Sequence, residues 1–324
     1  MRHLAVAALV CCFATGSGAA ERSSWTKFAS PHFELYTTTD EDAGRGIIYR
    51  LERLRAVLQP VLEWRGDARD EREKPVCIIA FGSRDEFQAY APISRSVGFF
   101  LPGRRRDFVV LDGSRVESRA AAHEYVHLVM SQSGLRLPTW LNEGLAELYS
   151  NLQESRSGRE TEIGRFIPSR LQSLREDHWI ELERLISADA ESPIFSQADL
   201  VDPAYAESWL LAHMLVLDPR YEAKFRALLA ALQTGESRQA FCEVYGKSVA
   251  EIERDLKHYL ETGQTNIRIL GDTPTFDFLI HAEGDADFDG LSAVAEMLGN
   301  YRGRIDESRE LYRRIERDYS RRVP

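Results

Sequence analysis

The sequence predicts an α+β fold: a small N-terminal mixed sheet, then a mainly helical lobe, then a C-terminal helical hairpin. Three observations predict this class. Runs typical of strands, such as Val76-Cys77-Ile78-Ile79-Ala80, are concentrated before residue 112. After that point apolar residues recur mostly at helical spacing. Two last helical segments, Leu291–Leu298 and Ile305–Tyr319, follow a stretch that contains Gly, Thr and Pro without a clear period.

The N-terminal segment has the pattern of a signal peptide over residues 1–20. Arg2 supplies positive charge, Leu4–Ala14 is a short apolar run, and Gly18-Ala19-Ala20 offers small residues for cleavage. The protein is therefore expected to be exported, either to the periplasm or out of the cell. A lipoprotein attachment site at Cys11 is the alternative, although the two residues before it fit that use poorly. No later apolar run is long enough to span a membrane.

Charge and cysteine content narrow the function classes further. The net charge of −10 argues against a nucleic-acid partner, because phosphate binding requires a basic surface. Beyond the leader only Cys77 and Cys242 remain. Export permits a disulfide between them, but two separate buried thiols are the favoured interpretation.

Several elements are expected before residue 112. Aromatic alternation predicts a strand over Phe28–Thr38, and helical spacing predicts an amphipathic helix over Asp40–Trp64. Pro75–Phe81 is expected to be a buried strand. Two more strands, Val97–Leu101 and Asp107–Leu111, flank a loop with Pro, Gly and three arginines, which predicts a hairpin. One interpretation of the loop is a solvated turn whose arginines keep an edge strand from pairing with other chains.

The stretch that carries chemistry is His123-Glu124-Tyr125-Val126-His127, an H-E-x-x-H pattern. On a helix, positions i and i+4 share one face, so His123 and His127 can offer two imidazoles to one ion. The Glu124 carboxylate could reach a metal-bound water as a base without ligating the metal. A single match of this pattern arises by chance often enough that the following residues decide its meaning.

Those residues predict a second helix that supplies a third ligand. Ser114 and Glu117 form an S-x-x-E capping box before the first helix, and Gly134 is placed to end it. If the chain reverses there and re-enters a helix near Thr139, Glu143 lies ~6 Å along the return path. Glu143 would then be level with the two histidines, as zinc coordination requires.

One turn further on the same face, Glu147 could accept the outer N–H of a ligand histidine. H-E-x-x-H followed by W-L-N-E-G-L-A-E, residues 140–147, resembles the gluzincin metallopeptidases. The resemblance implies that Glu143 is the third Zn²⁺ ligand and that Glu147 supports a histidine. It is closest to the bacterial peptidase MA-like proteins, because Trp25-Thr26-Lys27-Phe28 and Phe33-Glu34-Leu35-Tyr36-Thr37 resemble their opening segment. It covers roughly residues 25–262 and, without a G-A-M-E-N segment, does not imply aminopeptidase specificity.

The helix predicted over Tyr205–Leu217 resembles the tyrosine-containing helix of the gluzincins. The resemblance implies that the Tyr205 hydroxyl stabilises the oxyanion, and simple packing is an equally open interpretation. His213 projects from a roughly similar face and is expected to fill the core rather than line the cleft. The resemblance also offers a second interpretation of the strand Val97–Leu101, as a platform beside which a peptide substrate pairs.

The expected domains are a signal peptide over residues 1–20, a peptidase MA-like domain over residues 21–262, a linker over residues 263–285 and a helical hairpin over residues 286–324. Within the hairpin, Tyr301-Arg302-Gly303-Arg304 resembles the second half of a tetratricopeptide repeat. A single such unit cannot bury its own apolar face. It therefore either packs on the preceding domain or binds another protein.

Together these observations predict an exported zinc metallopeptidase that acts on a peptide or protein substrate. His123, His127 and Glu143 would hold Zn²⁺, Glu124 would act as the base, and Tyr205 would stabilise the oxyanion. No motif for serine, redox or nucleotide chemistry occurs after the leader. The alternative is a catalytically weak or inactive peptidase-like scaffold that binds a protein partner through its helical C-terminus.

Overall fold

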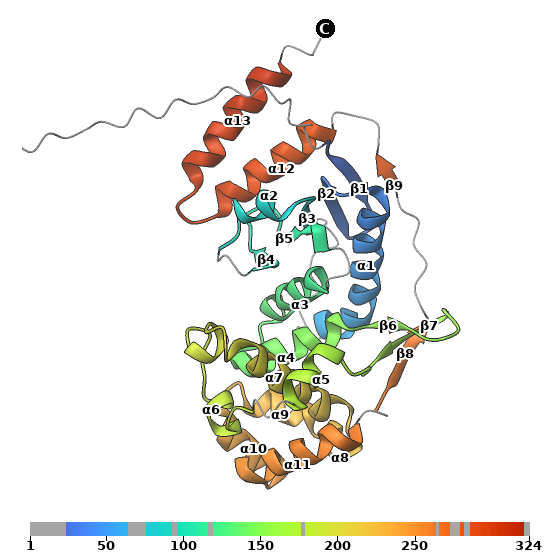
Figure 1. Ribbon diagram of the computed structural model, residues 1–324, viewed down its shortest axis with the longest axis vertical. Helices are drawn as coiled ribbons and strands as arrows, with labels where there is room; N and C mark the ends of the chain where they lie inside the picture. Colours follow the sequence, from blue (N-terminus) through green and yellow to red (C-terminus); the bar gives the residue numbers. More distant parts are fainter. Residues whose placement is uncertain are drawn as a thin grey trace, which may run out of the picture.

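Most of the chain after the leader is described by the computed structural model (Figure 1). The predicted signal peptide lies outside the described residues, as does Glu117 of the expected capping box. The described ranges are 24–63, 76–92, 96–115, 119–175, 179–263, 266–272, 279–281 and 286–320.

A six-stranded mixed sheet dominates the first part of the fold, with the strand order β4-β5-β3-β2-β1-β9. The central strands β2, β3 and β5 run parallel. The outer strands β4, β1 and β9 are antiparallel to their neighbours. The strands are β1 Thr26–Ala29, β2 Phe33–Thr37, β3 Val76–Phe81, β4 Gly98–Leu101, β5 Phe108–Asp112 and β9 Leu279–His281.

The single strand expected over Phe28–Thr38 is wrong, because the structure has the two antiparallel strands β1 and β2 there. Pro31 lies between them and has no N–H to donate to a ladder. The Ser30 N–H instead donates to the Phe33 carbonyl at 2.9 Å, and the Phe33 N–H donates to the Ser30 hydroxyl at 3.2 Å. This tight turn folds the aromatic segment back on itself.

Both faces of the sheet are covered, which explains the nearly continuous apolar run of β3. Ile78 and Ala80 belong to the core formed with α1 (Glu41–Glu63) and α3 (Ala120–Gln132). Cys77, Ile79 and Phe81 face the other way, into a second core shared with α12 (Ala286–Asn300). Figure 1 shows α12 and α3 on opposite sides of the sheet.

The helical lobe is built around α7, which is buried along almost its whole length. Gly144 of α4 lets the two helices approach closely, because a Cβ there would sit 2.3 Å from the Ser208 carbonyl oxygen of α7. No helix in the described ranges is both long and apolar enough to cross a bilayer. The helices of the lobe are α4 Thr139–Ser150, α5 Pro168–Arg175, α6 Leu182–Ile186, α7 Val201–Leu217, α8 Pro219–Glu222, α9 Phe225–Ala231, α10 Ser237–Tyr245 and α11 Val249–Thr262.

The segment expected to be a linker, residues 263–285, contains two strands. β8 (Arg268–Asp272) completes a small antiparallel sheet of order β6-β7-β8, with β6 at Gln153–Glu154 and β7 at Glu160–Ile163. β9 pairs with β1 at the edge of the large sheet. β8 lacks a sequence period because all five of its residues are exposed and pairing with the distant strand β7 defines it.

The C-terminal helices α12 and α13 (Ile305–Tyr319) form the expected hairpin, which confirms the predicted α+β class. The sequence left open whether this hairpin packs or binds another chain. In the structure α12 packs on the sheet, where Ala293, Val294, Met297 and Leu298 enter the second core. The Ser308 hydroxyl of α13 donates to the Ala295 carbonyl at 2.7 Å and ties the two helices together.

The disulfide alternative is wrong, because both cysteines are free. Cys77 is buried in β3, as expected, whereas Cys242 is exposed on α10 rather than buried.

Candidate metal site

Helix α3 carries the H-E-x-x-H residues and begins later than the capping box predicted. Its first residue is Ala120, and Arg119 precedes it without a capping side chain. Ser114 lies instead in a short 3₁₀ turn, where its hydroxyl and its N–H both donate to the Asp112 carboxylate. The C-terminal prediction is confirmed, because the helix ends at Gln132 and Gly134 has a positive φ of 73°.

The reversal at Gly134 brings α4 back alongside α3. Pro138 precedes α4 with an extended backbone and Thr139 begins it, as the sequence predicted. The buried side chains of Trp140 and Leu141 anchor its first turn in the core. The Trp140 indole N–H donates to the Ser237 hydroxyl at 2.9 Å, which fixes this turn against α10.

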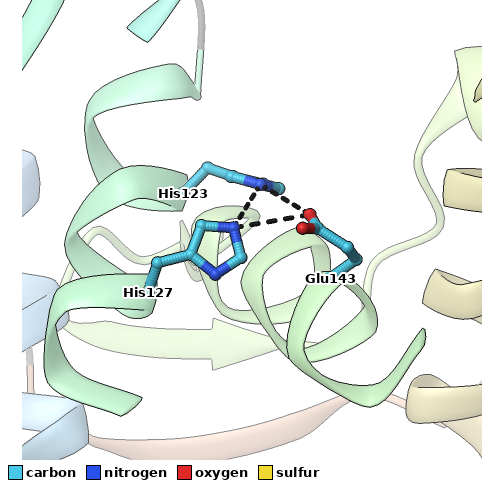
Figure 2. Close-up of side chains that lie close together, drawn as sticks. All are labelled: His123, His127 and Glu143. Atoms are coloured by element: carbon cyan, nitrogen blue, oxygen red, sulfur yellow. Dashed lines mark hydrogen bonds and ion pairs between the residues drawn. The ribbon is translucent and has the colours of Figure 1, made fainter. Parts of the chain in front are cut away.

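Three side chains from these two helices converge on one point (Figure 2). The Nε2 atoms of His123 and His127 are 3.0 Å apart. The Glu143 Oε2 atom lies 3.2 Å from the first of these nitrogens and 3.4 Å from the second. His123, His127 and Glu143 were predicted from the sequence as ligands of one ion. Within the described part of the chain, they are the group that could hold a metal ion.

In this group the His127 imidazole and the Glu143 carboxylate each favour the charged form of the other. Burial disfavours a charged imidazole, but the Glu143 carboxylate outweighs it and raises the pKa of His127 to about 9. Burial likewise opposes ionisation of Glu143, yet the two histidines hold its pKa well below the usual range. The pocket thus favours an ionised carboxylate together with a cation.

Glu147 lies behind His123 in the structure. Its Oε1 atom lies 3.5 Å from the His123 Nδ1 atom, on the side of the ring away from the cluster. Arg170 donates to both Glu147 oxygens at 2.9 and 3.1 Å, and Arg119 donates to Oε2 at 3.1 Å. Burial opposes ionisation of Glu147, but Arg170 above all lowers its pKa to about 2. It therefore stays ionised and can orient the ring.

The two arginines were missed by sequence reasoning. Arg119 immediately precedes α3 and Arg170 lies in the first turn of α5. Neither position belongs to a motif or an apolar period, so only the folded arrangement reveals them. The nearest sequence signal was the prediction that Glu147 accepts the outer N–H of a ligand histidine. In the structure this carboxylate is buried, and a buried carboxylate requires a partner.

Glu124 lies beside the cluster but outside it, under strand β4. A Cβ at Gly98 would sit 3.1 Å from the Glu124 Cγ atom, so the strand passes directly over this side chain. Burial raises the pKa of Glu124, while His123, His127 and the Phe100 backbone N–H partly oppose that shift. A raised pKa in a carboxyl group next to a reaction site is the condition for exchanging a proton near neutral pH.

Tyr205 enters the site from α7. Its ring lies over that of His123, with centroids 6.1 Å apart, and the Arg170 guanidinium carbon sits 5.4 Å from its centroid. Burial first, and then the neighbouring Glu143 carboxylate, strongly raise the pKa of Tyr205. The phenol therefore keeps its proton and remains a hydrogen-bond donor.

His213, on the same helix, belongs to the core as expected. Its Nδ1 atom is 2.8 Å from the Tyr259 hydroxyl, and its Nε2 atom is 2.8 Å from the Gly164 carbonyl oxygen. Burial lowers the pKa of His213 to about 4, so the ring is neutral. Helix α7 thus sends Tyr205 to the metal-site cluster and His213 to the interior.

Comparison with known families gives a match over part of the chain. Residues 118–240 are similar to a family described as "Protein of unknown function (DUF1570)". The matched segment contains the cluster, Glu124, Glu147 and Tyr205. A comparison with curated proteins found no match.

Proposed function

We propose that this protein is a zinc metallopeptidase that hydrolyses peptide bonds. The observation that carries the proposal is the convergence of His123, His127 and Glu143. Zinc takes nitrogen and oxygen ligands at 2.0–2.2 Å in tetrahedral geometry, which places ligand atoms about 3.3–3.5 Å apart. The separations here are 3.0, 3.2 and 3.4 Å, so an ion fits with small side-chain adjustments. The gluzincin-like spacing of the same residues supports this choice.

A zinc ion held by three protein groups lowers the pKa of a coordinated water to ~7 and polarises a carbonyl group. Glu124 is the base in this proposal. It lies next to both histidines without belonging to the ligand group, and its raised pKa suits a carboxylate that accepts a proton from water and returns it to the leaving amine.

Tyr205 supplies the second stabilising group. The attacked carbonyl oxygen gains negative charge, and an ionised Glu124 cannot help it because a carboxylate only accepts hydrogen bonds. The Tyr205 phenol stays protonated beside His123 and Glu143. It is therefore the donor that this site offers to the oxyanion.

Strand β4 is the proposed platform for the substrate. It is the last strand of the sheet order, so its outer edge has no partner strand among the described residues. The cluster lies against one face of β4, beside this edge: Gly98 lies on Glu124, and the Phe100 ring is 6.3 Å from the ring of His127. An extended peptide pairing there would pass the candidate metal position. We take the substrate to be a peptide or protein met after export, given the predicted signal peptide.

Metal analysis combined with a digestion assay tests the proposal. The mature protein should bind one zinc per chain and cleave a denatured protein substrate, and a chelator should abolish cleavage until zinc is restored. Failure to bind zinc with the fold intact would contradict the proposal. Stoichiometric zinc without cleavage of any peptide in a broad library would favour the alternative, an inactive scaffold that binds a partner.

A further inference from the structure

We propose that the C-terminal helical hairpin α12–α13 positions strand β4 in the candidate active site, with Tyr301 and Arg106 as the positioning residues. The functional part of this inference rests on the proposed peptidase activity. The contacts that carry it do not, because the packing of the strand, its turn and the hairpin is observed whatever reaction the site performs.

β4 lies between the metal-site cluster on one face and the hairpin on the other. Successive side chains of a strand point to opposite faces, so neighbouring residues of β4 contact the two regions. On one face Phe100 approaches His127, with ring centroids 6.3 Å apart. On the other face Phe99 meets Tyr301, in the turn between α12 and α13, edge-to-face at 6.0 Å and 87°. Phe99 is only 8% exposed, because Tyr301 and also Phe87, of helix α2 (Arg84–Gln88), pack against it. The hairpin therefore covers part of the side of the strand that faces away from Glu124.

The turn after β4 is fastened to the same hairpin. The Arg106 guanidinium bridges two carboxylates, with Nη1 2.6 Å from Glu34 of β2 and Nη2 2.8 Å from Glu296 of α12. The Arg104 backbone N–H also donates to the Asn300 side-chain oxygen at 3.0 Å. Arg106 is therefore not the solvated arginine that the sequence suggested, and it ties the β4–β5 turn to α12.

These contacts matter because β4 has a single neighbouring strand among the described residues. It is four residues long, begins with glycine and pairs only with β5 among the described strands. A short edge strand with one neighbour is poorly fixed by its own ladder. The hairpin adds to the restraint that α3 and Phe87 supply. The strand that it restrains carries both the proposed substrate edge and the Phe100 N–H that contacts Glu124.

The matched variants Tyr301→Ala and Tyr301→Phe test this inference, since only the first removes the ring that packs on Phe99. Hydrogen exchange should become roughly 2–10-fold faster over residues 98–101 in Tyr301→Ala, the loss expected for one aromatic contact, and stay at the wild-type rate in Tyr301→Phe. Zinc content should be unchanged in both. With a peptide substrate, KM should rise by a similar factor in Tyr301→Ala, with a smaller change in kcat.

Wild-type exchange over residues 98–101 in a folded Tyr301→Ala variant would overturn the inference. If that variant does not fold, Glu296→Gln keeps the side-chain size, weakens one of the two Arg106 contacts and should give a smaller increase in the same segment. No increase in Glu296→Gln would then overturn it. Exchange is measured without substrate, so a wild-type protein that shows no cleavage would reject the peptidase proposal and still leave this test in force.

Discussion

Among the described residues, histidine is buried in two regions, the metal-site cluster and the core of the helical lobe, and the two regions differ. In the metal-site cluster, His127 and Glu143 face each other and their pKa values move toward the charged forms. In the core of the helical lobe, burial lowers the pKa of His213 to about 4 and raises that of Glu207 to about 8. Both core groups are therefore neutral near pH 7.

The difference lies in what each group faces. His213 contacts a carbonyl oxygen and a tyrosine hydroxyl, and Glu207 accepts the Ile180 backbone N–H at 3.0 Å. Each of these partners forms a hydrogen bond with a single side chain that is neutral. In the cluster, ligand-type atoms from α3 and α4 point at one another across 3.0–3.4 Å, and a cation satisfies them all. Burial alone therefore does not identify a candidate functional site in this protein. The convergence of several side chains that can ligate one metal ion does.

The largest effect is expected when the proposed base of the metal site, Glu124, is replaced. Glu124→Gln should retain one zinc per chain and lose cleavage by about 10²–10⁴-fold, because the amide cannot accept the proton from water. Cleavage rates measured at equal zinc occupancy check this. Loss of zinc from the variant would instead place Glu124 among the ligands.

The next largest effect is expected at Tyr205. Tyr205→Phe deletes only the hydroxyl, so fold and zinc content should persist while kcat falls by ~10²–10³ with KM nearly unchanged. Steady-state kinetics of the zinc-loaded variant provide the measurement. Turnover equal to the wild type would mean that Tyr205 only packs on His123 and that another donor serves the oxyanion.

Removing the carboxylate behind His123 should have a moderate effect. Glu147→Ala is expected to weaken zinc binding by roughly 10–100-fold, because the imidazole loses the group that orients it. Asp202→Asn is the control, since Asp202 is an exposed partner of Arg170 at 3.4 Å that does not contact the cluster. Competition with a metal indicator measures both affinities, and equal affinities in the two variants would remove Glu147 from the site.

The last effect concerns stability in the core and leaves zinc binding and cleavage aside. The unfolded chain loses the Glu207 proton above about pH 4.3, whereas the folded chain keeps it up to about pH 8. Its stabilising contribution is complete below the lower pH and is lost as the pH rises to the upper one, by about 1.4 kcal/mol per unit of pKa difference. Glu207→Gln removes this dependence while keeping an acceptor for Ile180.

Thermal unfolding in a chelator at pH 5 and pH 8 measures that effect. The unfolding temperature of Glu207→Gln minus that of the wild type should be higher at pH 8 than at pH 5. An identical difference at both values would show that Glu207 is already ionised in the folded chain, and the contrast between the two regions would weaken.

The cluster could be predicted from the sequence because its geometry is local. His123 and His127 share a helix face, and Gly134 and Pro138 delimit a short reversal that returns Glu143 to the same level. The class of fold followed from periodicity in the same way. These features depend on residues close in the chain, for which spacing determines position.

The remaining features depend on contacts between distant segments. Arg170 reaches Glu147 from another helix, and Arg106 reaches Glu296 from the opposite end of the chain. Strand β9 exists because β1 offers it backbone groups. No spacing rule encodes such pairings. Only the folded structure therefore reveals the arginines that contact Glu147, the strands within residues 263–285 and the packing of the hairpin on the sheet.

The most direct test of the central claim compares zinc stoichiometry in His127→Gln and His213→Gln, two equivalent changes at the two kinds of buried histidine. His127→Gln should fold and bind no stoichiometric zinc, because one of the three converging atoms has lost its position and basicity. His213→Gln should bind one zinc per chain and unfold at a lower temperature, since it disturbs two buried hydrogen bonds. Full zinc occupancy in His127→Gln, or its loss from a folded His213→Gln, would contradict the account.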